Sequence, residues 1–418
     1  MRVVYLTCCG IDVHKSFLVA TIIKTDGFMP IYSKRRFSTY NGDILRLKEW
    51  LISNDCFDVC MESTGKYWIP VYNLLEDKIH VVIASPKWVA AVKGNKDDVK
   101  DSKWIGDLFR LGIVRASYIP DKPIRILREY TRYRVKLTGC HSSEKNRYQN
   151  SFTVCNVALD SVVSDMFGKS ASAITDYLTK TDEFKPEECK ALLKGSLKKK
   201  ADAVLESIEG YSISPAQRER MVIVRSHLNF VERTIDTLDT ATVELVKPYE
   251  GNISLLCTIP GVDRCTAISI ISEIGTDMSK FDSSKRLCGW AGLAPGNNQS
   301  AGKKKSVHIT RAGVYLKPAL VQAAHAAVKS KTSPYYSIKY ERISKRRGKK
   351  RAIIAIARMM LTAAYNMLKT GDAWNPADLF KVDMPPVLIE KQKQKAIKNA
   401  FNLLISQGLI DPKLLPAI

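Results

Sequence analysis

The sequence predicts an α/β layer fold in its N-terminal part, followed by regions that are mainly α-helical. Short runs rich in β-branched residues alternate with helical patterns up to about residue 120, which is typical of α/β layers. Two charged segments, 125–147 and 218–246, then carry apolar residues at helical spacing. A basic loop after about residue 330 and then an apolar helix over 352–368 are predicted, and the chain contains no internal repeat.

The N-terminal part is predicted element by element. The elements are strands over 3–11, 17–23 and 31–38, a helix over 43–53, a strand over 58–61, a helix over 68–75 and a strand over 80–84. Asp26 and Gly27 supply turn residues between the second and third strands. Three strands, a helix, a strand, a helix and another strand form an order compatible with a ribonuclease-H-like sheet.

Four domains follow from the changes of pattern. We expect an α/β domain, then a helical or coiled-coil arm, then a mainly α domain with a basic segment, and last a C-terminal linker with one helix. Their expected bounds are 1–120, 121–250, 251–371 and 372–418. Within the arm, 182–188 and 198–200 are polar and are expected to be connections. Three prolines between 372 and 386 predict the linker before a final helix over 389–407.

The chain is strongly basic, and its positive charge is concentrated in one segment. Lys and Arg number 65 against 42 Asp and Glu, which gives a net charge of +23 with neutral histidines. Between Lys303 and Arg351 there are fifteen Lys or Arg residues and one acid, Glu341. Charge of this sign and density attracts phosphate backbones, although a solvated helix face is the alternative. The cations expected to contact nucleic acid are Lys303, Lys304, Lys305, Arg311, Arg346, Arg347, Lys349, Lys350 and Arg351.

Neither secretion nor membrane insertion is expected. The first eleven residues lack the charged n-region and cleavage pattern of a signal peptide, and the longest late apolar run is broken by Arg358. The ten cysteines show no C-x-x-C pair, and Cys8 and Cys9 lie inside an apolar run. We therefore expect reduced core cysteines in a cytosolic protein.

Four carboxylates are predicted to lie at positions from which they could bind the same metal ions. Asp12 ends the first strand and Glu62 ends the short fourth strand, so both can point at one place. Asp98 and Asp101 are spaced i and i+3, which puts them on one face of a helix. Such a cluster stays ionised only beside cations, and its oxygen ligands favour Mg²⁺, with Mn²⁺ as a substitute. The four residues predict a site for one or two metal ions that act on nucleic acid.

Each of these acids also has an ordinary structural interpretation. Taken singly, they are explained as a turn former, a first-turn residue, a helix N-cap and a surface acid. Their coincidence on suitable elements favours the metal site. Asp97 and Asp107 are neighbouring competitors, and we expect Asp107 to be a surface charge.

A polar, glycine-rich loop is predicted from Gly292 to Gly302, and it leads into three lysines. Its backbone amides and ammonium groups suit a phosphate, and Ser300 is then a candidate nucleophile toward phosphorus. A flexible surface serine is the alternative, and Ser306 is the closest rival for the role. Spacing alone does not decide between the two serines.

Upstream of this segment, residues 259–264 are similar to the turn of a helix-hairpin-helix. Gly261 and the next helix N-terminus would present N–H groups to a DNA phosphate, while a plain helix–helix turn is the alternative. Within the basic segment, Tyr335, Tyr336 and Tyr340 are candidates for stacking on bases, and packing is expected for at least one of them.

Together these residues resemble the insertion sequence one-ten family of transposases, DEDD-type recombinases related to the Piv invertases. The resemblance covers most of the chain, and its motifs occur in order. They are G-I-D-V-H-K at 10–15, M-E-S-T-G at 61–65, D-V-K-D-S at 98–102, I-P-G at 259–261, W-A-G-L-A-P-G-N-N at 290–298, S-A-G-K at 300–303 and R-R-G-K-K-R-A at 346–352. The extension after about Asp372 is longer than the family pattern requires, and the sequence does not decide its role.

The resemblance implies an N-terminal RuvC-like domain that binds Mg²⁺, a helical arm and a C-terminal transposase domain with an essential serine. Asp12, Glu62, Asp98 and Asp101 take the acid positions, and Ser300 takes the nucleophile. It also implies covalent joining of that serine to a cut DNA strand, and a noncoding bridge RNA that pairs with donor and target DNA. The active sites would be shared between protomers of a dimer or tetramer, in a prokaryotic cytoplasm and at the nucleoid.

Three functions are therefore considered. The leading hypothesis is a transposase or site-specific recombinase that exchanges strands through a phosphoserine. The second is a metal-dependent, structure-selective endonuclease resembling a Holliday-junction resolvase, in which water attacks and Ser300 only contacts phosphate. The third is a non-catalytic nucleic-acid-binding scaffold. The guide RNA, the target site, the direction of recombination and the oligomeric state are not predicted by the sequence.

Overall fold

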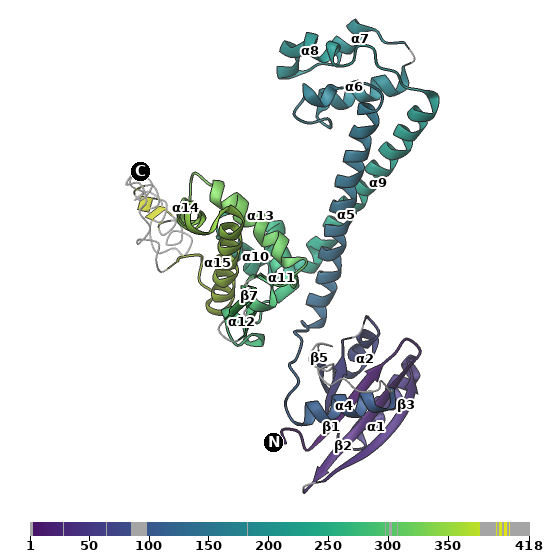
Figure 1. Cartoon of the computed structure of the whole chain (residues 1–418), viewed down its shortest axis with the longest axis vertical. Coiled ribbons are helices and arrows are strands. Elements are labelled where there is room, and N and C mark those ends of the chain that lie inside the picture. The colour runs from purple at the N-terminus through teal and green to yellow at the C-terminus, as the bar shows by residue number, and fades with distance from the viewer. Residues whose placement is uncertain are drawn as a thin grey trace. The chain divides into compact units, whose positions relative to one another are not determined.

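The structure is a computed structural model of the chain, and it divides into two compact units, Met1–Ile119 and Pro120–Ile418. It describes residues 3–27, 29–63, 65–84, 98–181, 183–296, 298–300, 303–306, 308–376 and, beyond them, 390, 393–394, 397–398 and 401; for 98–100, 298–300 and 303–306 it describes the backbone alone. Figure 1 labels the elements of the N-terminal unit and of the C-terminal unit.

The N-terminal unit is built on a mixed five-stranded sheet with the order β3-β2-β1-β4-β5. Its strands are β1 (Thr7–Val13), β2 (Phe17–Asp26), β3 (Met29–Ser38), β4 (Asp58–Glu62) and β5 (His80–Ala84). The first three are antiparallel neighbours, whereas β4 runs parallel to both β1 and β5. Gly27 turns the chain between β2 and β3 with a φ of 62°, a conformation that glycine adopts without strain.

Helices cover both faces of this sheet. They are α1 (Asn41–Ile52), α2 (Trp68–Leu75) and α4 (Asp98–Arg110). Successive side chains of a strand point to opposite faces, so β1 contributes to two cores. Cys9 and Ile11 pack in the core under α1 and α2, whereas Cys8 packs with Ile105 and Phe109 of α4. The order of strands and helices is the one predicted from the sequence.

The arm of the C-terminal unit consists of two helices of 32 residues, α5 (Lys122–Thr153) and α9 (Pro215–Val246), which pack side by side (Figure 1). Ser214 closes a capping box in front of α9. Across the pair, Arg134 donates to both carboxylate oxygens of Asp239, at 2.5 and 2.8 Å. The charged segments predicted to be helical lie inside these two helices.

Between α5 and α9, residues 154–214 form a small helical body, which we call the tip (Figure 1). It contains η1 (Leu159–Ser161), α6 (Lys169–Lys180), α7 (Pro186–Ala191), η2 (Gly195–Lys200) and α8 (Ala201–Glu206). Its core packs Ile174 against Phe152 of α5 and Met221 of α9. The polar stretches expected to be connections instead run into α7 and η2, because the apolar residues between them are buried in this core.

A helical bundle follows the arm. Its elements are η3 (Lys247–Tyr249), α10 (Glu250–Leu256), α11 (Arg264–Ile274), η4 (Met278–Lys280), α12 (Ser284–Trp290), β6 (Asn298–Ser300), β7 (Lys303–Ser306), α13 (Leu316–Lys329), α14 (Tyr335–Arg347) and α15 (Lys349–Thr370). The central helix α15 packs against α12, α13 and α14. The sequence predicted a basic loop before this apolar helix, but the structure has α14 there, because Tyr335 and Tyr336 bury one side of that segment.

A buried ion pair joins the arm to the bundle. Glu273 of α11 has a side chain only 6% exposed and accepts hydrogen bonds from Arg132 of α5 at 2.7 and 2.9 Å. One turn earlier, Arg128 donates to the backbone oxygens of Ser272 and Glu273. Removing one partner of a buried pair costs about 3–5 kcal/mol because the other charge is left unpaired. The α5–α11 junction therefore depends on both partners being present.

In the part of the chain that the structure describes, α15 is long and apolar enough to cross a membrane, and half of its apolar window is buried inside the protein. Its buried residues, among them Ile356, Met360 and Leu361, belong to the bundle core. The linker predicted from 372 is described only as far as 376, and most of the helix predicted over 389–407 lies outside the described residues.

All ten cysteines are free, and most of them lie in cores. Burial raises the pKa of Cys8, Cys56 and Cys60 to about 12, so these thiols stay protonated at neutral pH. Cys257 and Cys265 differ from the expectation of core residues, because both are exposed around the turn between α10 and α11.

Candidate active site

Asp12 and Glu62 lie near the carboxyl ends of two neighbouring parallel strands. Gly10 of β1 pairs with Cys60 of β4, and two residues further along each strand come Asp12 and Glu62. Gly10 and Cys60 both face α4. Side chains two residues apart in a strand share a face, so the two carboxylates lie on the face of the sheet that α4 covers.

The helix α4 packs directly on the backbone of β1 because glycines remove the side chains between them. A Cβ atom at Gly10 would stand 2.1 Å from the carbonyl oxygen of Ser102 and 2.3 Å from the backbone nitrogen of Gly106. Ser102 and Thr21 of β2 share a buried hydrogen bond of 2.8 Å. These contacts hold one turn of α4, the turn that carries Asp101, against the sheet.

The pKa of the Asp12 carboxyl group is affected by acids on two neighbouring elements, α4 and β4. Burial raises its pKa most, the nearby His14 opposes the shift, and the carboxylates of Asp101 and Glu62 raise it further. Its Oδ2 atom lies 3.0 Å from Nε2 of His14. The two atoms are close but are not aligned for a hydrogen bond. Both atoms are buried, and among the described residues neither has a hydrogen-bond partner. The carboxylates of Asp101 and Glu62 therefore lie near enough to Asp12 to raise its pKa.

The fourth acid, Asp98, is the first residue of α4, one turn before Asp101, and its side chain is outside the described residues. Among the residues described, no group of three or more His, Cys, Asp or Glu side chains is close enough to hold a metal ion. Asp97 also lies outside the described residues. Asp107 accepts a hydrogen bond from Tyr32 at 3.1 Å and is half-buried, so it is a structural contact and not the surface charge we expected.

Ser300 is the last residue of β6 in a two-stranded hairpin, where the sequence predicted a loop. It pairs with Lys303 of the antiparallel strand β7, and a bridge between Pro295 and Ile309 closes the base of the hairpin. Ser306, the rival serine, ends β7. The side chains of β6 and β7 are outside the described residues, so the backbone alone places the serines and the lysines on one hairpin.

Gly261 lies in the turn between α10 and α11 with a φ of 86°. A Cβ atom there would stand 2.5 Å from the carbonyl oxygen of Ala323 and 2.7 Å from the nitrogen of Ala327, both in α13. Packing against α13 therefore requires glycine at this position, in addition to the backbone conformation. Asp263 caps α11 by accepting a hydrogen bond from the N–H of Thr266 at 2.8 Å, so one of the first-turn N–H groups is already engaged.

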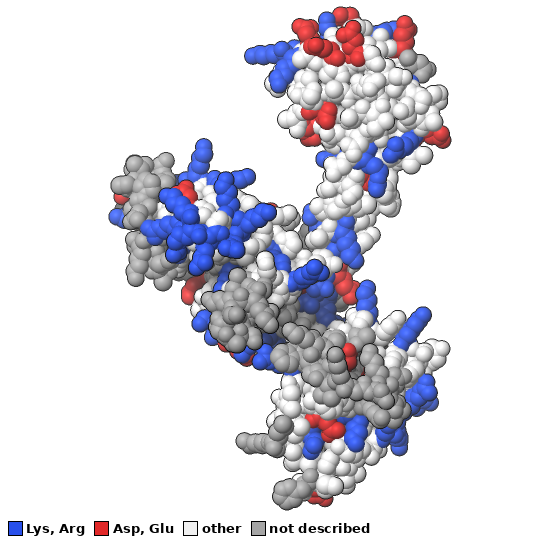
Figure 2. Space-filling view, in the orientation of Figure 1, with Lys and Arg blue, Asp and Glu red and all other residues white. Residues whose placement is uncertain are grey.

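The predicted nucleic-acid-binding cations with described side chains are exposed. They are Arg311, Arg346, Arg347, Lys349, Lys350 and Arg351. All but the first belong to the basic junction (residues 345–351), where Gly348, with a φ of 81°, turns the chain from α14 into α15. Figure 2 shows basic side chains crowded over α14 and the adjoining part of α15. Cations in the first turn of α15 oppose its helix dipole, so their presence there favours an anionic partner over a stabilising role.

Tyr335 and Tyr336 are packed in the bundle, with exposed fractions of 5% and 1%. Both rings contact the ring of Trp374, and Nε1 of Trp374 donates to the hydroxyl of Tyr336 at 3.2 Å. These two tyrosines are therefore not available to stack on bases. Tyr340 is half-buried on the same helix.

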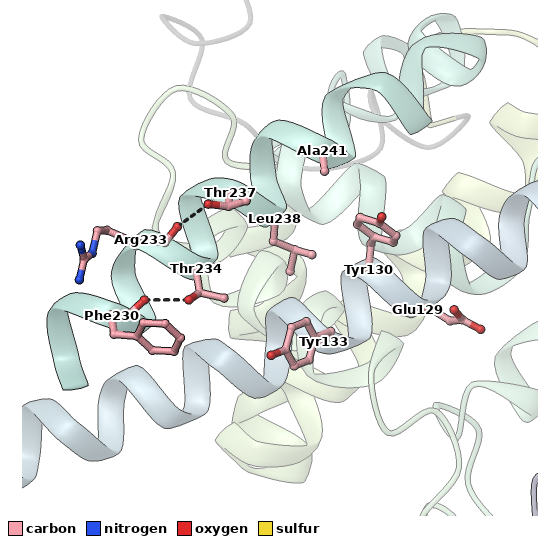
Figure 3. A pocket seen from close by; sticks show the side chains of 9 residues that line it. All are labelled: Glu129, Tyr130, Tyr133, Phe230, Arg233, Thr234, Thr237, Leu238 and Ala241. Atoms are coloured by element: carbon pink, nitrogen blue, oxygen red, sulfur yellow. Dashed lines mark hydrogen bonds between the residues drawn. The ribbon is translucent and has the colours of Figure 1, made fainter. Parts of the chain in front are cut away.

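A shallow apolar groove of about 800 Å³ lies between α5 and α9. Figure 3 shows the rings of Phe230 and Tyr133 in this groove, and the hydroxyl of Thr234 turned back to the backbone oxygen of Phe230 at 2.8 Å. Among the residues with described side chains, none that is predicted to act in catalysis or in nucleic-acid binding lines it. The groove is therefore a feature of the arm and not of the candidate active site.

Two glycines and one histidine of the active site were not singled out from the sequence. Gly10 stands two residues before Asp12, and a glycine inside a strand marks a close backbone approach, so the sequence held a signal for this contact. Gly106 and His14 had no such signal, because their roles depend on contacts made only in the folded unit.

Two family models match the chain. A DEDD-type model of the IS110 group, described as "Transposase", matches residues 9–156, and a model described as "Transposase IS116/IS110/IS902 family" matches residues 253–341. The first range contains the four predicted acids and the second contains Ser300. The mixed sheet of the N-terminal unit thus lies within the range that the DEDD-type model matches. The chain belongs to the IS116/IS110/IS902 family of transposases.

Curated relatives match a part of the chain. The pilin gene-inverting proteins of Moraxella bovis and Moraxella lacunata are each 34% identical over 119 residues, which is 28% of this chain and 36% of the relative. A putative transposase, y4qE, of Sinorhizobium fredii (strain NBRC 101917 / NGR234) is 31% identical over 81 residues, 19% of this chain and 20% of the relative. The match with the first two thus spans 36% of their length.

Proposed function

We propose that this protein is the transposase of an insertion sequence and acts as a site-specific recombinase that cuts DNA strands and rejoins them. The observation that supports this most is the interaction of Asp12 with Asp101 and Glu62 on one face of the sheet, in a chain of a transposase family. Asp98 is proposed to join them from the first turn of α4. The relatives named for inverting pilin genes support recombination over simple cleavage.

A divalent cation is the proposed cofactor of these carboxylates, with Mg²⁺ first and Mn²⁺ as a substitute. The residues fit it, because Oδ2 of Asp12 is buried without a hydrogen-bond partner among the described residues, and burial with neighbouring carboxylates raises the pKa of Asp12. A cation would supply the missing partner and offset the repulsion between the acids. When bound, it stabilises the negative charge that develops on a phosphate during displacement.

Ser300 is the proposed nucleophile. Its hydroxyl oxygen attacks the phosphorus of a phosphodiester, its proton passes to a base, and the bond to the leaving deoxyribose oxygen breaks as that oxygen takes up a proton. Rejoining reverses these steps, since a deoxyribose hydroxyl attacks the phosphoserine and releases the serine. The covalent link preserves the bond energy of the phosphodiester, which explains why a site rich in carboxylates would need a serine.

DNA is the proposed substrate, and the basic junction is proposed to hold its phosphates, together with Arg311 and with Lys303, Lys304 and Lys305 of β7. A noncoding bridge RNA is proposed to pair with donor and target DNA, so the protein need not read sequence itself. The active site would be shared between protomers of a dimer or tetramer, acting in a prokaryotic cytoplasm.

Trapping a covalent protein–DNA adduct tests this function. The full chain is combined with donor and target DNA, Mg²⁺ and the RNA transcribed from the flanks of its gene, and we expect an adduct that survives denaturation. Ser300→Ala is expected to abolish both the adduct and strand joining, whereas Ser306→Ala retains both. Joining at wild-type yield by Ser300→Ala would rule out the proposed mechanism.

The same assay separates the alternative functions. Cleavage without an adduct, retained in Ser300→Ala and lost in Asp12→Asn, would identify a structure-selective endonuclease that uses water. Binding of DNA without cleavage, unchanged in Asp12→Asn and Glu62→Gln at saturating Mg²⁺, would identify a scaffold.

A further inference from the structure

His14 is close enough to Asp12 to share a cation with it. Nε2 of His14 lies 3.0 Å from Oδ2 of Asp12, just beyond the end of β1. Both atoms are buried, and neither has a hydrogen-bond partner among the described residues. An ion pair at this distance is normally stabilised by an aligned N–H···O hydrogen bond. The lack of that alignment between His14 and Asp12 therefore requires an explanation.

Two other histidine–carboxylate pairs in the same chain are hydrogen-bonded, whereas a third, Nδ1 of His227 and Oε1 of Glu144 at 3.3 Å, lacks hydrogen-bond geometry. Nδ1 of His80 lies 2.8 Å from Oδ1 of Asp58, and Nε2 of His141 lies 2.9 Å from Oε1 of Glu232, both with hydrogen-bond geometry. The side chain of His80 is 61% exposed, and that of His14 is 34% exposed. The His14 pair thus differs from the two hydrogen-bonded pairs in alignment, from the His80 pair also in burial, and from the His227 pair in its shorter distance of 3.0 Å.

The imidazole ring of His14 is held in its orientation by the turn between β1 and β2. The backbone N–H of His14 donates to the carbonyl oxygen of Phe17 at 2.9 Å and closes this turn. The ring then packs on that of Phe17, with centroids 4.5 Å apart, and the guanidinium of Arg36 lies 4.0 Å from the same Phe17 centroid. Nε2 is therefore held beside Asp12 before any ligand binds, as a ligand atom should be.

The 3.0 Å separation of Nε2 and Oδ2 is that of two adjacent ligands on one ion. An octahedral ion with ligand distances of about 2.1 Å holds neighbouring ligand atoms about 3.0 Å apart. The nitrogen lone pair would then point at the ion, and the carboxylate oxygen would lie well away from the lone-pair direction. A close pair without hydrogen-bond alignment matches shared coordination better than it matches an ion pair.

We propose that Nε2 of His14 is a direct ligand of the cation that Asp12 holds, so the metal site contains a nitrogen donor among its carboxylates. This rests on the metal site of the proposed function and adds to it a ligand and a metal preference. Imidazole nitrogen suits transition-metal ions, whereas Mg²⁺ favours oxygen ligands, so the nitrogen donor shifts the preference of the site away from Mg²⁺ and toward transition-metal ions, of which Mn²⁺ is the proposed substitute.

Pulsed electron paramagnetic resonance of bound Mn²⁺ tests the ligand. The full chain is loaded with Mn²⁺ alone, and the echo modulation from directly coordinated ¹⁴N is recorded. Wild-type protein is expected to show this modulation and His14→Gln to lose it. His80→Gln, which removes a hydrogen-bonded histidine of the same unit, is the matched control and is expected to keep it. Circular dichroism confirms folding, and His14→Asn replaces His14→Gln if the latter does not fold.

Affinity gives a second measurement. His14→Gln is expected to weaken Mn²⁺ binding by about 10–100-fold and Mg²⁺ binding much less. Bound Mn²⁺ without ¹⁴N modulation in the wild type, or modulation that persists in His14→Gln, overturns the role of His14 and leaves the carboxylate site standing. Failure of the wild type to bind Mn²⁺, or binding unchanged in Asp12→Asn, overturns the metal part of the proposed function and the role of His14 with it.

Discussion

The acid-bearing face of the N-terminal unit and the basic junction of the C-terminal unit hold charge in opposite ways. Asp12 is half-buried, and packed backbone places it beside its neighbours, with Gly10 tight against Ser102. The cations of the basic junction are exposed at two helix ends on either side of Gly348. The acid-bearing face depends on the exact position of each residue, whereas the basic junction spreads its attraction for an anionic partner over many residues.

This difference predicts how the two regions respond to substitution. Charges in a partly buried site interact more strongly than charges in water, which are also screened by salt. Single changes around Asp12 should therefore act strongly, and single changes in the basic junction should act weakly. The following predictions test that contrast from the largest expected effect to the smallest.

Gly10→Ala is expected to have the largest effect on stability. Its Cβ would stand 2.1 Å from the backbone oxygen of Ser102, so α4 must move away from β1. We expect a loss of about 3 kcal/mol or more in the free energy of unfolding of the N-terminal unit, at the upper end of overpacking costs. Hydrogen exchange of peptides from β1 measures this loss.

Two other glycines provide controls for this change. Gly106→Ala should cost less, because its Cβ meets the flexible end of Ile23 at 2.7 Å and the nitrogen of Gly10 at 3.1 Å. Gly42→Ala in α1 meets no atom within 4 Å and should be neutral or stabilising by about 0.5–1 kcal/mol. Equal stability of Gly10→Ala and Gly42→Ala would show that α4 does not depend on close contact with β1.

Removing three charges of the basic junction should give a graded loss of DNA affinity. In the combined Arg346→Ala, Arg347→Ala and Lys349→Ala variant, log affinity should fall less steeply with log salt concentration. The magnitude of the slope is expected to decrease by about three, since each phosphate contact contributes roughly one. Fluorescence anisotropy of a labelled duplex at several salt concentrations measures this slope.

The control removes exposed lysines that already have acidic partners. Lys185 lies 3.5 Å from Glu188, and Lys190 lies 3.3 Å from Glu187, all on the tip. Lys185→Ala with Lys190→Ala should leave the slope unchanged. A wild-type slope in the three-residue variant would place the phosphate-binding surface elsewhere.

Asp12→Asn should stabilise the metal-free protein at neutral pH. The pKa of Asp12 is raised in the folded unit, first by burial, so the folded state holds this proton more tightly than the unfolded chain does. That stabilisation is present in acid and is lost as the pH rises through the raised pKa, above the ordinary aspartate value of about 3.9. The variant should gain on the order of 1 kcal/mol at pH 7 and nothing at pH 3.

Thermal unfolding in EDTA at a series of pH values measures this gain. The melting temperature of Asp12→Asn should exceed that of the wild type by a margin that grows with pH. A variant less stable than the wild type at pH 7 would mean that the ionised carboxylate, with His14 beside it, is a stabilising group in the metal-free protein.

Local sequence patterns predicted the elements of the N-terminal unit well, because strand alternation and turn residues such as Gly27 act over a few positions. The same patterns put Asp12 and Glu62 near strand ends, and the structure places both near the carboxyl ends of β1 and β4. The contact of Gly106 with β1 and the approach of His14 to Asp12 were not predictable, because they arise when distant segments or side chains meet in the folded unit.

The C-terminal unit was predicted less completely for a related reason. The tip has its own core between α5 and α9, but its apolar residues are spread over short helices with polar stretches between them, which resemble connections in sequence. The segment that forms α14 is so rich in Lys and Arg that its sequence resembles a loop. It is a helix in the structure because Tyr335 and Tyr336 are buried in the bundle. The catalytic role of Ser300 stays a prediction.

Strand joining by Asp12→Asn tests the central claim, that the acids on the α4 face of the sheet hold the cation used to recombine DNA. Wild type and variant are assembled with the same RNA and DNA, and joined product is measured as Mg²⁺ is raised, with DNA affinity measured in parallel. We predict that the variant loses about 10²–10³-fold or more of its joining rate at every Mg²⁺ concentration while it binds DNA as tightly as the wild type. Wild-type joining by Asp12→Asn would contradict the account.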